Sequence, residues 1–280
     1  MPDVILYHIP PSFYSQIARL TLHELEVPFK AKVVAAGPPT FETYKPWYMK
    51  LNPMGTVPTL VHDKHVVPDS DAIVRYAVET LSSVKRIPDA AEAKDAMEHW
   101  MAALRAIPIR ELSYGAESQR DMGQRVNGMR VRNLETRGKM RPDMAAIYAK
   151  KVEDIQGFAE RAVDDDLVSG HREQVALRLD EMNALLDGQP WLAGDNYSLA
   201  DTVWTVGVAR FMMLKLDPLE GRPALGDWYG RVKARPSFEA ANVWEYFDAT
   251  AMLLMLGRKF LPQLLLIASG IALLVWWLLR

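Results

Sequence analysis

Two short segments place serine hydroxyls at the expected first turns of helices. Ser12 opens an apolar pattern that predicts a helix ending near 26–28, and the pair Asp69-Ser70 opens another helix. Free backbone N–H groups and the helix dipole attract anions to such positions, and a hydroxyl adds a donor. Ser70 could therefore hold a carboxylate, and Ser12 could stabilise a thiolate. The alternative at Ser12 and Asp69 is an N-cap that serves only its own helix.

Other kinds of chemistry find less support in the residue types. The chain has no cysteine, which excludes disulfides, thiolate-metal sites and a cysteine nucleophile. His62 and His65, with Asp63 and Asp69, straddle a turn and lack an obvious fourth ligand, so we expect no metal site. A net charge of −2 gives no general attraction to nucleic acid, and we expect no nucleic-acid partner.

The order of the predicted elements divides the chain into two folded domains. Residues 1–82 alternate between short apolar strands and helices, which predicts a small mixed α/β sheet flanked by helices. Residues 83–90 form the predicted linker, and residues 91–247 form an all-helical domain with an insertion around 113–145. The expected strands are 4–8, 29–34, 58–61 and 65–67, and the expected later helices are 91–113, 143–187, 199–216, 222–234 and 237–247.

The insertion lies in a locally basic region. Residues 105–141 carry nine basic residues against four acidic ones. The simplest interpretation is a solvated pair of helices. A surface that faces anionic lipid or an acidic partner is the second interpretation, and a nucleic-acid patch is the third.

The end of the sequence predicts a membrane anchor. Residues 260–279 carry no formal charge, and twenty helical residues span about 30 Å, the thickness of the hydrocarbon core of a bilayer. We therefore expect a transmembrane helix over 260–280, preceded by a basic juxtamembrane segment over 248–259. The basic residues before the span and the lack of a signal peptide predict a single-pass protein whose body lies on the cytoplasmic side. The alternative is a buried C-terminal helix.

An ordered set of short motifs over residues 3–247 resembles the glutathione S-transferase superfamily. Two branches look most similar, the tail-anchored ganglioside-induced differentiation-associated proteins and the bacterial tetrachlorohydroquinone reductive dehalogenases. The segments that carry the resemblance are Leu6-Tyr7-His8, Ser12-Phe13-Tyr14-Ser15-Gln16, the run 46–53, Val57-Pro58-Thr59-Leu60, Asp69-Ser70 and Ser198-Leu199-Ala200-Asp201.

The resemblance implies a fold and a ligand. The fold is a thioredoxin-like α/β N-terminal domain and an all-α C-terminal domain, here followed by one C-terminal transmembrane helix. The ligand is glutathione. A cis proline at Pro58 would expose the N–H and C=O of Val57 to the cysteinyl backbone of glutathione, although an ordinary strand-entering proline is the alternative. Ser70 would bind the γ-glutamyl carboxylate, and Asp69 its amine.

The resemblance also implies a reaction. Ser12, with Ser15 as the alternate, would donate to the glutathione thiolate, which would conjugate, reduce or isomerise a small electrophile in a pocket formed by Tyr14, Arg105 and Tyr114. The dehalogenase branch carries a reactive cysteine where this chain has Tyr14. A mixed disulfide with the enzyme is therefore not expected. A non-catalytic, glutathione-responsive membrane scaffold is the alternative function, and a homodimer is the usual assembly of the superfamily.

Overall fold

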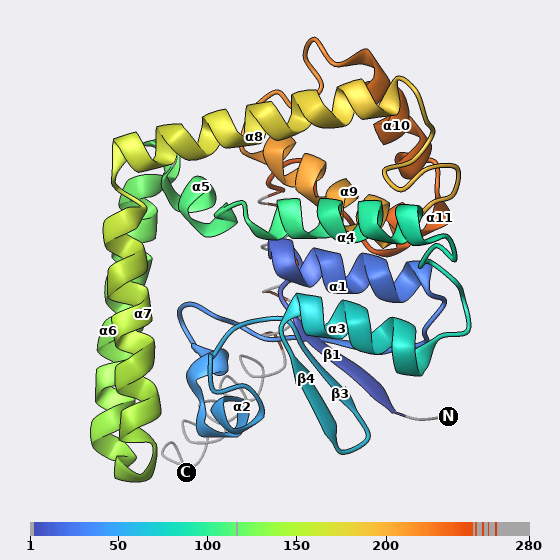
Figure 1. The fold of residues 1–280 in the computed structure, drawn as a ribbon. Helices are drawn as coiled ribbons and strands as arrows, with labels where there is room; N and C mark the ends of the chain where they lie inside the picture. Colours follow the sequence, from blue (N-terminus) through green and yellow to red (C-terminus); the bar gives the residue numbers. More distant parts are fainter. Residues whose placement is uncertain are drawn as a thin grey trace, which may run out of the picture. The chain divides into compact units, whose positions relative to one another are not determined.

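A four-stranded mixed sheet organises the first part of the chain (Figure 1). The computed structural model describes residues 3–115, 117–248 and the single positions 250, 254, 257 and 261. The strands follow the order β2-β1-β3-β4. Their bounds are β1 (Val4–His8), β2 (Lys30–Val33), β3 (Thr59–His62) and β4 (His65–Pro68). The β1–β2 pair is parallel and the β3–β4 pair is antiparallel, as the sequence predicted, and the structure adds an antiparallel pairing of β1 with β3.

Apolar side chains of the sheet pack against two helices. The helices are α1 (Phe13–Glu24) and α3 (Ser70–Tyr76), the latter followed by the π-helical turn η2 (Ala77–Leu81). Leu6 and Leu60 from the sheet, Leu22 from α1 and Ile73 from α3 are buried in one cluster. Figure 1 shows α1 and α3 between the sheet and the helical domain. The connection from β2 to β3 contains η1 (Glu42–Tyr44) and α2 (Pro46–Leu51).

The second part of the described chain is helical. Two of the expected long helices are interrupted: the first near Pro108, whose ring cannot continue a helix, and the second at 162–164. The helix expected over 237–247 is wrong beyond Ala240, where the observed helix ends. The bounds are α4 (Ala91–Arg105), α5 (Ile109–Gly115), α6 (Glu117–Met140), η3 (Pro142–Met144), α7 (Ala145–Arg161), α8 (Asp165–Leu186), α9 (Leu199–Met213), α10 (Pro223–Lys233) and α11 (Pro236–Ala240).

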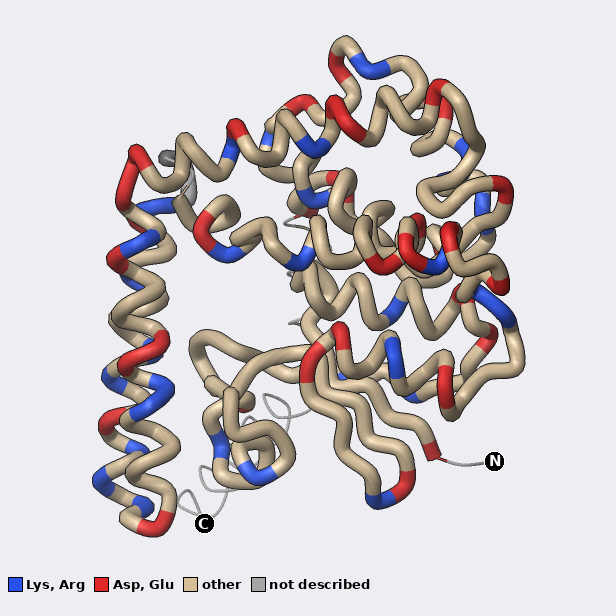
Figure 2. Tube along the Cα trace, viewed as in Figure 1, with Lys and Arg blue, Asp and Glu red and all other residues tan. Residues whose placement is uncertain are grey.

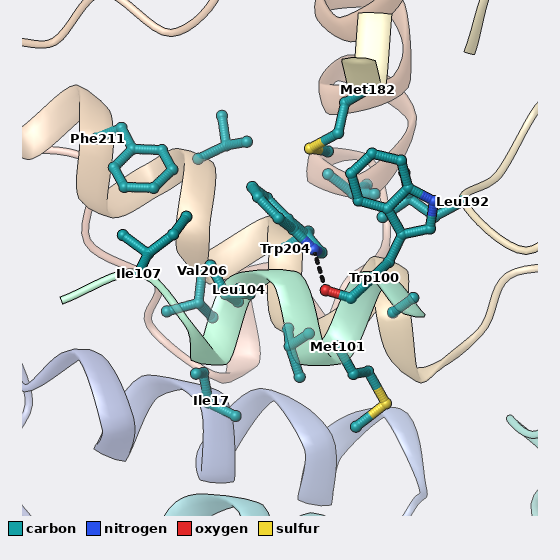
Figure 3. Close-up of a cluster of buried hydrophobic side chains, with 14 of the residues drawn as sticks. Ile17, Trp100, Met101, Leu104, Ile107, Met182, Leu192, Trp204, Val206 and Phe211 are labelled. Carbon is teal, nitrogen blue, oxygen red and sulfur yellow. Dashed lines mark hydrogen bonds between the residues drawn. The ribbon is translucent and has the colours of Figure 1, made fainter. Parts of the chain in front are cut away.

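The core of the helical part surrounds α9, in which thirteen of the fifteen residues are buried. The Trp204 indole Nε1 donates a hydrogen bond to the Trp100 carbonyl of α4 at 2.7 Å (Figure 3). Asp201 holds the start of α9, because its carboxylate accepts hydrogen bonds from the Ser198 backbone N–H and from Trp228 Nε1, each at 2.9 Å. Figure 3 places Ile17 of α1 beside this cluster, so the same core joins the two domains.

Helix α6 makes up most of the predicted insertion around 113–145 and packs along α7 as a helical hairpin. Tyr148 of α7 and Leu134 of α6 are buried with Phe41, Tyr44 and Met49 of the N-terminal domain. The Tyr148 hydroxyl donates to the Tyr44 carbonyl at 3.1 Å. Figure 2 shows residues of both charges distributed along the two helices. The hairpin therefore has a solvated side, as expected, and an apolar side that holds the segment around α2.

The predicted transmembrane helix over 260–280 and most of the juxtamembrane segment over 248–259 lie outside the described residues. Within the part of the chain that is described, no helix is both long and apolar enough to cross a membrane. The described chain up to Glu245 forms one compact unit.

Candidate functional site

One cavity of about 430 Å³ collects six of the residues named from the sequence. It lies where the start of α1, the turn before β3 and the start of α3 face α4 and α9. The lining includes Tyr14, Val57, Pro58, Asp69, Ser70 and Arg105. Ser12, Ser15 and Tyr114 do not line it.

The turn before β3 presents the backbone of Val57 to this cavity. The Val57-Pro58 peptide bond is cis, as the resemblance predicted. The Asn52 amide and the Tyr48 hydroxyl both donate to the Thr56 carbonyl, at 3.1 Å and 2.7 Å, and thereby hold the turn in place. Within the described residues, neither the N–H nor the C=O of Val57 forms a hydrogen bond. A backbone donor and acceptor are thus available to an extended peptide ligand.

Asp69 and Ser70 have different roles at the start of α3. The Asp69 carboxylate caps the helix by accepting from the backbone N–H of Asp71 at 2.7 Å and of Ala72 at 3.5 Å. The Ser70 hydroxyl lines the cavity and makes no hydrogen bond to any described residue. The backbone of Asp69 has φ 77° and ψ 143°, a region that is costly for any residue except glycine and is often retained at ligand-binding sites. Asp69 is therefore an N-cap, and Ser70 has an unused donor.

Ser12 and Ser15 lie at the start of α1 in different surroundings. Ser12 is the N-cap, and its hydroxyl accepts a long hydrogen bond of 3.4 Å from the Ser15 N–H. Its side chain is half-buried. Ser15 is fully buried, and its hydroxyl accepts from the Ile9 N–H at 3.3 Å. Ser12 is therefore better placed than Ser15 to reach a ligand, whereas Ser15 holds the preceding loop.

Two buried arginines, which the sequence did not single out, hold the loop before Ser12. Arg19 donates to the Pro10 carbonyl at 3.0 Å and contacts His8 Nδ1 at 3.1 Å. Arg210 donates to the Pro11 carbonyl. Burial, together with the charge of Arg19, lowers the pKa of His8 to about 3, so His8 is a neutral acceptor at ordinary pH.

The sequence did contain a signal for both arginines. Each is a lone charge in an otherwise apolar helical run, one between Ile17 and Leu20 and the other between Ala209 and Phe211. Because a buried charge is costly, such a residue is usually retained for a specific contact.

Of the three residues predicted for the electrophile pocket, Tyr14 and Arg105 line the cavity and Tyr114 does not. Tyr14 lies at the rim of the cavity with 37% of its surface exposed, and burial of the rest of the ring raises its pKa. Arg105 lines the cavity but forms an ion pair with Asp71 at 2.6 Å. Tyr114 packs edge-on against Phe158 of α7, with 5.5 Å between ring centroids. The lining near α1, α4 and α9 is mostly apolar, formed by Phe13, Ile17, Met101, Leu104, Ile107 and Val203.

His62 and His65 both pack against the side chain of Tyr76. His62 Nδ1 lies 2.8 Å from the Tyr76 hydroxyl, and the His65 ring stacks on Tyr76 with centroids 5.0 Å apart. Among the described residues, no three His, Asp or Glu side chains are grouped closely enough to hold a metal ion.

The fold and the site together define a class of protein. A thioredoxin-like domain, in which the N–H and C=O of Val57 are available beside a cis proline, is joined to a helical domain. Two family models match this chain: the glutathione S-transferase N-terminal domain over residues 11–80 and the glutathione S-transferase C-terminal domain over residues 144–236. The chain belongs to the glutathione S-transferase family.

Individual relatives fall in the branches that the motifs indicated. The tetrachloro-p-hydroquinone reductive dehalogenase of Sphingobium chlorophenolicum is 35% identical over 244 residues, which cover 87% of this chain and 97% of that protein. The human ganglioside-induced differentiation-associated protein 1-like 1 is 24% identical and is covered over 72% of its length, against 84% of this chain. Among solved structures, the glutathione-bound theta-class glutathione S-transferase of Xanthomonas axonopodis pv. citri is similar in fold, with a TM-score of 0.61 at 21% identity over 86% of this chain and 97% of that one.

Proposed function

We propose that the protein binds glutathione in the cavity beside α1 and α3 and activates its thiol for reaction with a small electrophile. The observation that carries the proposal is that two residues lining one cavity have unused hydrogen-bonding groups: the N–H and C=O of Val57 and the hydroxyl of Ser70. Unpaired polar groups cost free energy in a folded protein unless a ligand or water satisfies them. The backbone groups of Val57 and the N-terminus of α3 at Ser70, at one cavity, suit an extended peptide that ends in a carboxylate.

Glutathione would lie across the ends of the sheet and of α3. Its cysteinyl backbone pairs with Val57 in the manner of an added strand, and its γ-glutamyl carboxylate accepts from the Ser70 hydroxyl at the start of α3. The thiol then lies toward the start of α1. There the helix dipole and the Ser12 hydroxyl stabilise the thiolate, which is the reactive form.

The second substrate enters on the apolar side of the same cavity. The thiolate sulfur attacks an electrophilic carbon, a C–S bond forms, and the leaving group departs with its electron pair. The thiol proton passes to solvent. Because Tyr14 replaces the cysteine of the dehalogenase branch, reduction through a mixed disulfide with the protein is not part of the proposal.

Two simple measurements test this function. We expect the purified protein to be retained on immobilised glutathione and eluted by free glutathione, and to accelerate the reaction of glutathione with chlorodinitrobenzene. Retention without turnover of this or other generic electrophiles would favour the glutathione-responsive scaffold. Absence of both would overturn the proposed site.

We also propose that residues 260–280 anchor the protein in a membrane, with the folded body on the cytoplasmic side. The support is compositional: residues 261–279 include eight Leu, two Ile and one Val, which favour insertion by about 3 to 6 kcal/mol before the polar residues subtract. A tether of this kind would place the glutathione site close to apolar electrophiles dissolved in the lipid.

A further inference from the structure

Four basic side chains gather beside the glutathione cavity without enough acidic partners. They come from four helices of the helical domain: Arg110 of α5, Arg130 of α6, Lys151 of α7 and Arg210 of α9. We call this group the basic cluster. Lys151 and Arg210 are buried, with 6% and 8% of their surfaces exposed.

Two members of the basic cluster share one carboxylate. Lys151 Nζ lies 2.7 Å from one Asp154 oxygen, and Arg110 Nη1 lies 3.4 Å from the other. The Arg110 guanidinium also stacks over the Phe158 ring, 4.1 Å from its centroid. Tyr114 packs against the same ring, so Arg110 and Tyr114 lie around one aromatic side chain.

The other two members form no ion pair with any described residue. Arg130 donates to the Ala36 carbonyl and to Asn127 Oδ1, both at 3.1 Å. Arg210 donates to the Pro11 carbonyl and to the sulfur of Met213, and its buried Nε has no partner among the described residues. Both guanidinium groups therefore donate only to uncharged acceptors and keep an uncompensated positive charge.

The charges of the basic cluster do not balance. Four cations and one carboxylate leave three positive charges in excess. The neighbouring Glu111 does not reduce this excess, because its carboxylate pairs with Arg161 at 3.0 Å. Arg210 is buried and Arg130 is half-buried, and neither has a carboxylate partner among the described residues. A cation removed from water without a counter-ion is costly, so this excess of positive charge indicates a place where an anion binds.

The basic cluster adjoins the glutathione cavity at Tyr14. The Arg210 guanidinium lies 6.0 Å from the centroid of the Phe13 ring, and Phe13 packs edge-on against Tyr14 with 5.1 Å between ring centroids. Tyr14 lines the cavity, and its surface and the Arg110 side chain are each 37% exposed. A ligand in the apolar part of the cavity could therefore reach the basic cluster past Tyr14.

We propose that the basic cluster binds an oxyanion, a carboxylate or a phenolate, carried by the second substrate. The inference rests on the proposed function for the location of that substrate and adds its chemical class: an electrophilic aromatic ring with an anionic oxygen substituent. The ring lies against Phe13 and Ile107, and the oxyanion accepts hydrogen bonds from guanidinium groups of the basic cluster.

Two matched probes test the charge preference directly. Chlorodinitrobenzoate and chlorodinitrobenzene have the same ring and leaving group, but only the first carries an anionic oxygen. Calorimetry without glutathione gives the two association constants, and their ratio measures the preference for the anion. We expect the parent protein to prefer the benzoate by about tenfold or more, the effect of one charge-assisted hydrogen bond. An equal affinity for the two probes would overturn the inference.

Three variants locate the preference in the basic cluster. Arg110→Gln and Arg210→Gln should each lower the ratio of association constants by about tenfold, whereas Asp154→Asn, which removes the shared carboxylate, should raise it. Arg178→Gln is the matched control, because Arg178 forms an exposed ion pair with Glu181 on α8. A ratio that is unchanged in both Arg110→Gln and Arg210→Gln would contradict the inference.

The design separates this inference from the proposed function. The probe ratio is measured without glutathione, so a protein that failed to bind glutathione could still show the preference of the basic cluster. Arg110→Gln keeps the test valid if a buried substitution prevents folding, since Arg110 is partly exposed and makes no hydrogen bond to the loop before Ser12.

Discussion

Ser70 and Ser12 occupy the same kind of position, the first turn of a helix, but their hydroxyls have different partners. Asp69 caps α3 and leaves the Ser70 hydroxyl free of partners among the described residues, whereas Ser12 itself caps α1. Replacement of each serine should therefore have different consequences. Loss of Ser70 should affect the ligand alone, and loss of Ser12 should affect both the helix and the ligand.

Ser70→Ala should weaken glutathione binding by about 1 to 3 kcal/mol, because a donor to a carboxylate is lost. The thermal unfolding midpoint should stay close to that of the parent, since the cap made by Asp69 remains. Calorimetric titration with glutathione gives the affinity. An affinity equal to that of the parent would remove the carboxylate role from Ser70.

Ser12→Ala should raise the pKa of the thiol of bound glutathione and reduce the conjugation rate most at low pH, with partial recovery as the pH rises. It should also cost about 0.5 to 2 kcal/mol of stability through loss of the N-cap. Ser15→Ala is the comparison: it leaves the half-buried Ile9 N–H without its acceptor, so it should destabilise the protein without moving the thiol titration. The reverse result would assign the thiol to Ser15.

Residues whose role depends on neighbours in the chain could be predicted from the sequence, and residues whose role depends on distant contacts could not. Val57-Pro58 and Asp69-Ser70 stand beside local signals of turns and helix starts. Arg210, in contrast, reaches Pro11 across 199 residues of chain. Nothing in the local pattern around Arg210 specifies that partner, although its lone charge marks it as unusual.

At the scale of elements, one buried carboxylate joins both domains. Glu24, in the last turn of α1, forms a bidentate pair with Arg235 at 2.7 Å for each bond and contacts Arg86 of the linker at 3.3 Å. Ser237 at the start of α11 also donates to it. Burial alone would raise the pKa of Glu24, but these hydrogen bonds and charges outweigh burial and lower the pKa below its ordinary value of 4.5.

The lowered pKa predicts a specific dependence of stability on pH. The unfolded chain takes up a proton at Glu24 more readily than the folded protein, so this stabilisation is complete above pH 4.5 and is lost as the pH falls through 4.5 toward the folded pKa. Glu24→Gln should remove that part of the acid dependence and cost about 3 to 5 kcal/mol at neutral pH, because Arg235 loses its partner. Denaturant unfolding between acid and neutral pH measures both effects.

The exposed pair Arg178 and Glu181 provides the control for Glu24. Glu181→Gln should change the free energy of unfolding by no more than about 0.5 kcal/mol, because a surface ion pair contributes little. If Glu24→Gln changed the free energy of unfolding as little as Glu181→Gln does, the contacts of Glu24 with Arg235 and Ser237 would not stabilise the junction between α1 and α11.

The observed strands and helices agree closely with those predicted from the sequence, and the differences are instructive. Alternating apolar residues and turn signals predicted the four strands within one or two residues. The helix expected over 91–113 is interrupted near Pro108, because proline breaks helices. The prediction missed the interruption because the apolar pattern continues across the proline. The contact of the α6–α7 hairpin with Phe41 and Tyr44 could not be predicted, since it depends on tertiary packing between distant segments.

At the scale of the whole molecule, the tail should determine location without affecting the site. The residues that line the cavity all lie at or before Val203, within the unit that ends at Glu245. A chain truncated after Gly257 should therefore bind glutathione with the affinity of the full chain. It should leave the membrane fraction, in which the full chain should be found. A full-length protein in the soluble fraction, or a truncated protein that unfolds, would contradict the anchor.

The central claim is that the protein holds the glutathione thiol at the start of α1 and favours its thiolate. The most direct test is the ultraviolet absorbance of the thiolate of bound glutathione as a function of pH, with glutathione-free protein as the blank. The account predicts a titration midpoint clearly below about 8.5, the value for a free cysteine thiol. A bound thiol that titrated like free glutathione would contradict the account, because the site would then bind the tripeptide without activating it.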